Sequence, residues 1–181
     1  MQMITRHAGR PGNVGTWDQG RLLRIYLRDH EAAALGGVQL FRRCSKANQT
    51  TQYAAALARL TIAVQADRDA LRNICVQFNV RFSNVRRAIA YAGATLVRVK
   101  TNGRVFKYSP LSRVIELEAL SAGVMSKLRL WESLLDVAHD ERRLDAADLE
   151  RRIADAHDQL MVLKGLHDEA GDEAFKPTHG Q

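Results

Sequence analysis

Proline is scarce in this chain. It occurs only at Pro11, Pro110 and Pro177, so Pro110 alone interrupts the long stretch between the two ends. Aromatic residues make up 6% of the sequence, and β-branched residues are few beside alanine, leucine and arginine, which favours helix over sheet. With 181 residues, 46% of them hydrophobic, the chain is long and apolar enough to bury a core. We therefore expect an all-α protein built from long helices.

Long apolar runs are also missing. No stretch reaches the ~18 consecutive apolar residues that a membrane span requires, and the N-terminal segment lacks the apolar core of a secretory signal. These absences predict a cytoplasmic protein with no transmembrane segment. Cysteine occurs only at Cys44 and Cys75. In a helical hairpin that turns near residue 49 their thiols lie roughly 30 Å apart, too far for a disulfide, so both are expected to be small buried hydrophobes.

Acidic residues are absent from the middle of the chain, between Asp69 and Glu116. The net charge of +7 is therefore divided unevenly. Residues 1–110 carry 18 Lys or Arg against 5 Asp or Glu, whereas residues 111–181 carry 9 against 15. Such asymmetry indicates either a basic face for an anionic partner or attraction between the two halves of the chain.

Apolar residues recur at helical spacing in several segments. Capping residues mark where these segments begin: Thr16 or Asp18, then Ser83, then Ser109 followed by proline, then Asp145. The predicted helices cover about 16–46, 51–78, 84–99, 110–138 and 145–175.

The helix predicted over 110–138 has two apolar faces, so we expect it to be the most buried. The first face comprises Leu111, Val114, Ile115, Ala122, Met125 and Leu128. The second comprises Leu117, Leu120, Val124 and Trp131. Met125, and Met161 in the last helix, are interpreted as flexible core filler.

The order of these helices predicts an architecture. One hairpin joins the first two long helices and another joins the last two, with a connection over 79–109 that contains its own short helix. A connection of that length can travel along the whole bundle, as in a ferritin-like four-helix bundle. The alternative is a five-helix bundle in which the middle helix is an equal member. We expect a flexible arm over 1–15, one bundle domain over 16–175 and a frayed tail over 176–181.

Three runs carry a resemblance to a known family. They are YLRDHEAAALGGVQLFRR (26–43), ADRDALRNICVQFNV (66–80) and YSPLSRVIELEALSAGVMSKLRLWESL (108–134). Together they resemble an uncharacterised ferritin-like helical family common in actinobacteria, over roughly residues 20–175. The shared motifs are helix-packing patterns, so the resemblance implies a fold and brings no established reaction with it.

A ferritin-like bundle raises the question of a metal centre. Di-iron bundles use a Glu from each of two helices and a Glu-x-x-His motif from each of the other two. The hairpin turns place Glu31 opposite Asp67, which interrupts the apolar stripe of its helix, and bring His157 to about the same depth. Glu118 lies about two turns away, and Asp29 and His30 flank the same level. No Glu-x-x-His motif occurs in the chain.

The candidate ligands of a divergent iron site or single-metal site are therefore Glu31, Asp67, Glu118 and His157. Both of the Glu-x-x-His motifs that a di-iron site requires are incomplete. The competing interpretation is that the three carboxylates are ion-paired structural groups, because a buried carboxylate is most often simply paired. In that interpretation His157 is a histidine of a polar face.

The connection between the two hairpins is strongly basic. Its cations are candidates for contacts with phosphates or with an acidic protein: Arg81, Arg86, Arg87, Arg98, Lys100, Arg104 and Lys107. Phe106 or Tyr108 is placed to stack on bases. Two other interpretations stay open: the apolar run 88–99 lies on an anionic membrane, or it packs on the bundle while the cations meet the acidic last helix.

No catalytic motif accompanies these features. The chain lacks a phosphate-binding glycine loop, a nucleophile elbow, a Cys-x-x-Cys pair and a His-Glu-x-x-His motif. The pair Gly36–Gly37 is interpreted as a packing device for close helix approach. The leading hypothesis is a non-enzymatic ferritin-like bundle without a cofactor that self-associates or binds an acidic partner. The alternatives are an iron-binding protein or oxidase, and nucleic-acid binding through the basic connection.

Overall fold

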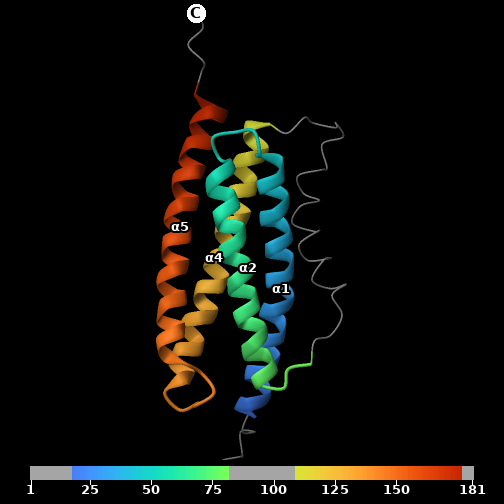
Figure 1. Cartoon of the computed structure of the whole chain (residues 1–181), viewed down its shortest axis with the longest axis vertical. Helices are drawn as coiled ribbons and strands as arrows, with labels where there is room; N and C mark the ends of the chain where they lie inside the picture. Colours follow the sequence, from blue (N-terminus) through green and yellow to red (C-terminus); the bar gives the residue numbers. More distant parts are fainter. Residues whose placement is uncertain (1–17, 82–108, 177–181) are drawn as a thin grey trace, which may run out of the picture.

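The computed structural model describes residues 18–81 and 109–176, which form four long helices and no strand. Their bounds are α1 Gln19–Ala47, α2 Ala54–Gln77, α4 Pro110–Ala138 and α5 Ala146–Phe175 (Figure 1). The sequence-based prediction of these four helices is confirmed. The predicted arm over 1–15, the short helix over 84–99 and all but the first residue of the predicted tail lie outside the described residues.

Three of the four helices begin at the cap that the sequence indicated. The side chain of Asp18 accepts a hydrogen bond from the backbone N–H of Arg21 at 3.1 Å. Ser109 accepts one from Ser112 at 3.2 Å, directly before Pro110. Asp145 accepts one from Asp148 at 3.2 Å. Each of these bonds satisfies an N–H group that has no partner inside its helix.

Helix α2 begins later than expected, at Ala54, and Tyr53 before it makes no side-chain cap. The turn is organised by Asn48, which is fully buried and donates to the carbonyl of Cys44 at 2.8 Å. The hydroxyl of Thr51 donates to the carbonyl of Asn48 at 2.9 Å. These bonds hold residues 51–53 in the turn and so delay the start of the helix.

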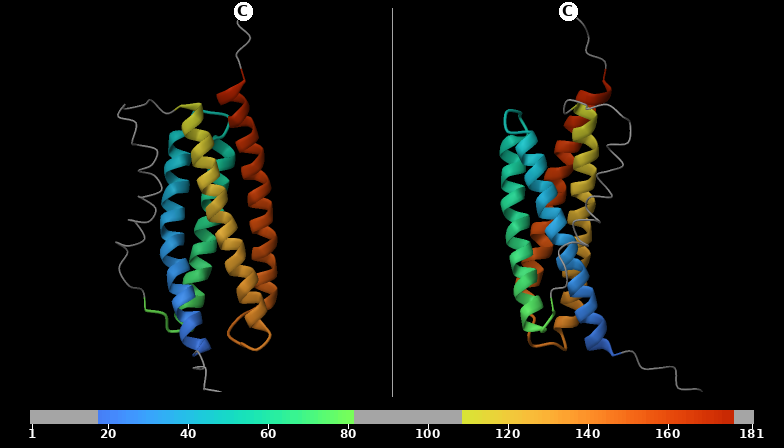
Figure 2. Two further views of the ribbon diagram at one scale, coloured as in Figure 1. Left: turned by 180° about the vertical axis from the view of Figure 1, so that it is seen from behind. Right: turned by 90° about the vertical axis from the view of Figure 1, so that its right-hand side faces the viewer.

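The helices form two antiparallel hairpins, α1–α2 and α4–α5, that pack side by side mainly through α1 and α4 (Figures 1 and 2). Arg113, near the start of α4, donates from Nε to Asn48 Oδ1 at 2.9 Å, which places this end of α4 beside the α1–α2 turn. Arg143, in the α4–α5 turn, lies 4.0 Å above the ring of Phe78 at the end of α2. Helices α2 and α4 therefore run in the same direction.

A cluster at one end of the bundle joins the two hairpins. The guanidinium of Arg113 is ion-paired with Glu173 of α5 and lies 4.4 Å from the ring centre of Tyr53. The Tyr53 hydroxyl donates to the Glu173 carboxylate at 3.0 Å. One carboxylate on the last helix thus ties together the α1–α2 turn and both helices of the second hairpin.

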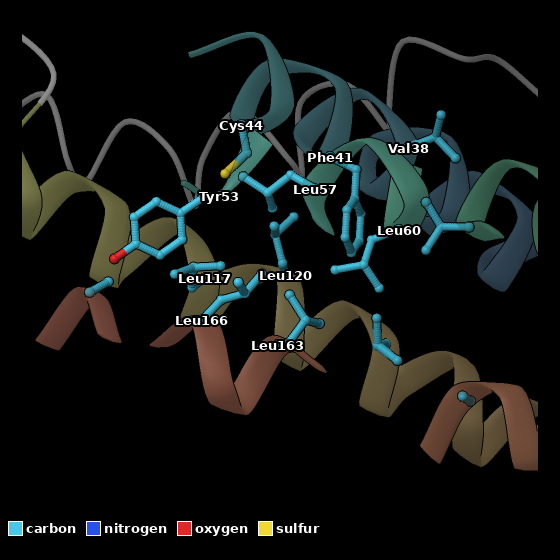
Figure 3. Packing of buried hydrophobic residues seen from close by; sticks show 14 of the residues in the cluster. Val38, Phe41, Cys44, Tyr53, Leu57, Leu60, Leu117, Leu120, Leu163 and Leu166 are labelled. Atoms are coloured by element: carbon cyan, nitrogen blue, oxygen red, sulfur yellow. The ribbon is translucent and has the colours of Figure 1, made fainter. Parts of the chain in front are cut away.

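The apolar core is divided into two clusters along the bundle. One lies toward the α1–α2 turn and is shown in Figure 3; it includes Phe41, Leu57, Leu117 and Leu163. The other lies toward the α4–α5 turn and includes Leu27, Leu71, Trp131 and Leu149. On α2 the boundary between the clusters falls at Asp67.

Helix α4 is the most buried of the described helices, as predicted; its second predicted face is buried throughout, whereas the first is buried only in part, at positions such as Val114 and Leu128. Leu117, Leu120, Val124 and Trp131 are at most 1% exposed, whereas Leu111 and Met125 are 50% and 42% exposed. The expected core role of Met161 was also wrong, because its side chain is 67% exposed. Both apolar faces have the spacing of a helix, so the sequence pattern alone does not show which of them is covered. The positions of α1 and α5 decide that.

Both cysteines are buried and free, as predicted. Cys44 belongs to the first cluster and Cys75 to the second. Burial raises the pKa of the Cys75 thiol to about 11. The thiol therefore stays protonated near neutral pH and behaves as a small apolar side chain.

The described helices carry charged residues along their outer faces. None of them has a stretch long and apolar enough to cross a membrane.

The two faces of α4 give a direct test of the core. Replacing Leu117 by alanine is expected to lower the free energy of unfolding by about 2–5 kcal/mol, because the cavity is fully enclosed. Met125→Ala is the matched control and is expected to change it by less than about 0.5 kcal/mol. Denaturant unfolding followed by circular dichroism measures both. Equal losses in the two variants would contradict the assignment of the buried face.

Candidate functional site

A buried charge network crosses the middle of the bundle and contains Asp67, which is 5% exposed. Its carboxylate accepts a hydrogen bond from the ammonium of Lys127 on α4 and another from Gln159 Nε2 on α5 at 3.2 Å. Arg152 Nη1, also on α5, lies 3.5 Å from the same carboxylate. The Lys127 ammonium also donates to Gln159 Oε1 at 2.5 Å. We call these four residues the central polar layer.

The central polar layer lies between the two apolar clusters. On α2, Asp67 falls between Val64 of the first cluster and Leu71 of the second. On α5, Arg152 falls between Leu149 of the second cluster and Ala156 of the first. Three helices therefore meet at one level through charged and amide groups instead of apolar side chains.

Within the central polar layer, Lys127 is the residue whose pKa is clearly shifted by its surroundings. Burial lowers the pKa of its ammonium, and the neighbouring Asp67 carboxylate raises it, with burial the larger effect. The net result is a pKa below the ordinary value of lysine, with Asp67 opposing the effect of burial. Loss of Asp67 would remove the main group that favours the charged form.

A second ion pair lies next to this layer and joins α1 to α2. Arg68 Nη2 donates to Glu31 Oε1 at 2.9 Å, and Arg72 Nε lies 4.0 Å from the same oxygen. The Arg68 and Glu31 side chains are 14% and 12% exposed. Glu31 is thus neutralised by arginines of the facing helix.

The other two candidate metal ligands lie at the surface. The Glu118 side chain is 60% exposed, and its Oε1 is 3.3 Å from Nε2 of His167. His157 is exposed on α5. Within residues 18–81 and 109–176, no group of three or more His, Cys, Asp or Glu side chains is close enough to hold a metal ion. The structure brings Glu31 and Asp67 to cations and does not gather the four candidates.

The contacts of Glu31 and Asp67 are those of the competing interpretation, in which the carboxylates are ion-paired structural groups. The partners of Asp67 were not identified from the sequence. Lys127 interrupts the α4 pattern between Val124 and Trp131, and that polar position inside the second apolar face is the signal that could have found it. Of the seven candidate cations of the basic connection, only Arg81 lies within the described residues, and it is exposed.

A cleft of about 110 Å³ lies beside the central polar layer, between α1, α2 and α4. Its walls are mostly apolar, and Asp67, Arg68 and Lys127 also line it. Gly37 on α1 and Gly123 on α4 both belong to its lining, and a Cβ atom added at either would meet nothing within 4 Å. Of the pair Gly36–Gly37, expected to allow close helix approach, Gly37 does not serve that role because its missing side chain leaves open space, whereas Gly36 is buried.

The central polar layer makes a prediction about stability. Lys127→Met is expected to lower the free energy of unfolding by about 3 kcal/mol, because it leaves Asp67 buried with weaker compensation. The double variant Asp67→Leu/Lys127→Met is expected to regain most of that loss, since no buried charge of the pair remains. Lys164→Met is the control: its pair with Asp168 is solvent-exposed and should cost less than about 1 kcal/mol. Similar losses for the two single variants, measured by urea unfolding, would contradict this role of the layer.

Comparison with protein-family models, with curated proteins and with solved structures finds no match to this chain. What these side chains do must therefore follow from their own contacts and charges.

Proposed function

We propose that this protein is a ferritin-like bundle that acts through its surface, by self-association or by binding an acidic partner, and not through a metal centre of its own. The observation that carries the proposal is the ammonium of Lys127 against the carboxylate of Asp67 at the middle of the bundle. The parallel course of α2 and α4 supports the ferritin-like arrangement, because it fits two hairpins joined by a full-length crossover.

The central residues do not fit an iron site. A metal ion needs carboxylate oxygens that are free to bind it, and a cation held against Asp67 competes for those oxygens and repels the metal charge. Glu31 is held in the same way by Arg68. Displacing both cations would leave two buried positive groups without partners, which is costly.

The surface offers charge complementarity instead. Helix α5 carries exposed acids, and Glu150, Asp158 and Glu169 have no ion pair within the part of the chain that the structure describes. The N-terminal portion over 1–110 has an excess of 13 positive charges. A basic surface of one copy therefore complements the acidic face of α5 on another, and would equally attract a different acidic macromolecule.

Iron loading tests the first half of the proposal. After anaerobic incubation with ferrous iron, desalting and exposure to air, elemental analysis is expected to find far less than one iron per chain. Any residual iron should be the same in Asp67→Asn, because the carboxylate is not a ligand. Two irons per chain, with an oxidation-dependent absorbance band that Asp67→Asn abolishes, would contradict the proposal and support the iron-binding alternative.

Sedimentation equilibrium tests the second half. The wild-type chain is expected to self-associate at low salt and to dissociate as salt screens the charges. Asp158→Asn/Glu169→Gln should weaken association about tenfold, whereas the matched pair Asp29→Asn/Asp69→Asn should not, because it removes acids from the basic half.

If sedimentation shows that the chain is monomeric, the next test is whether it binds a different acidic macromolecule. Titration with poly-L-glutamate and with duplex DNA then separates an acidic protein from a nucleic acid. DNA binding that falls steeply with salt, without poly-glutamate binding, would favour the nucleic-acid alternative. A monomer that binds neither probe at low salt would refute the proposal.

A further inference from the structure

The cleft between α1, α2 and α4 has the shape of a small-molecule site. Its walls are built by buried apolar residues from three helices, among them Val38, Phe41, Val64 and Leu120. Small residues widen it where it reaches the surface: Gly123 and Ser126 are exposed and Gly37 is half-buried. An engineered apolar cavity of about 150 Å³ holds one benzene ring, so a cleft of about 110 Å³ suits a single ring or a short alkyl chain.

Two buried hydrogen-bond donors of the lining residues have no partner among the residues that the structure describes. They are Nε of Arg68 and Nε1 of Trp131, and the Trp131 side chain is fully buried. Both residues line the cleft. An unsatisfied buried donor destabilises the folded protein, and such groups are rare enough in folded proteins that each needs a physical reason. A ligand that brings acceptor oxygens into the cleft supplies that reason.

The charge of the lining indicates what kind of acceptor. Arg68 and Lys127 bring two positive charges to the lining and Asp67 brings one negative charge, while Glu31, the partner of Arg68, lies outside the lining. An anionic acceptor is therefore favoured over a neutral one, and a cationic ligand is disfavoured. A water molecule needs two to four polar partners, and most of the wall of this cleft is apolar.

From the volume, the unpartnered donors and the charge of the lining together, we propose that this cleft binds a small carboxylate with an apolar body, such as a short-chain alkanoate or an aryl carboxylate. The donor atoms of Arg68 and Trp131 are themselves buried, so the two side chains turn toward the cleft when the carboxylate oxygens accept from their N–H groups, and the alkyl or aryl body packs on the apolar walls. The inference is independent of the proposed function, because the cleft uses neither the acidic face of α5 nor the basic connection.

Hexanoate is the probe, with hexanol and hexylamine as controls that keep the same chain and change only the head group. Titration calorimetry is expected to give saturable binding of hexanoate, at least tenfold tighter than that of hexanol, and no binding of hexylamine. In a Trp17→Phe background Trp131 is the only tryptophan. Its indole N–H resonance should then shift with hexanoate along the same binding curve.

Two glycine variants locate the site. Gly123→Leu fills the cleft from α4 without a clash, because no atom lies near its added Cβ. It should reduce hexanoate affinity at least tenfold. Gly165→Leu is the matched control: its position on α5 is equally open and does not line the cleft, so affinity should be unchanged. Trp131→Phe keeps the apolar body, removes the donor and should weaken hexanoate binding about threefold to tenfold.

Three results would overturn the inference. The first is no saturable hexanoate binding in the wild-type chain, which would mean that water or another part of the chain satisfies the cleft. The second is equal affinity for hexanoate and hexanol, which would remove the role of the donors. The third is an equal loss in Gly123→Leu and Gly165→Leu, which would place binding elsewhere.

Discussion

The packing of the whole bundle depends on the buried carboxylate of Asp67. A carboxylate with 5% exposure between two apolar clusters is expensive unless a cation and hydrogen bonds compensate it. Lys127, Arg152 and Gln159 provide that compensation from two other helices. Sliding α2 by one turn along its neighbours would separate Asp67 from all three, so the central polar layer favours one register of the helices over others that apolar packing alone would tolerate.

The same layer decides which chemistry the centre of the bundle can support. In a ferritin-like bundle the centre is where inward-pointing carboxylates hold metal. Here each central carboxylate already faces a lysine or an arginine. The cationic side chains leave a small polar end on an otherwise apolar cleft, and the combination suits a ligand that carries its own negative charge. On α5, the exposed acids Glu150, Asp158 and Glu169 have no ion pair within the described residues.

Local sequence signals predicted the helices because the interactions that define a helix are local. The caps at Asp18, Ser109 and Asp145 act within three residues of themselves. The late start of α2 was missed because Asn48 is buried by contacts that include Arg113 on α4, distant in the chain. The burial of Asp67 could be suspected from the break it makes in an apolar stripe, whereas its partner Lys127 is sixty positions away.

By itself, the sequence determined that this protein is helical, where its four described helices end and where three of them begin, and that its charge is divided between its two halves, because propensity, periodicity and composition act over short range. Only the tertiary structure decided which face of α4 is buried, which cations neutralise Glu31 and Asp67, and that Gly37 and Gly123 border open space. Those outcomes depend on how helices distant in sequence are placed against one another, and a single helical period is compatible with more than one such placement.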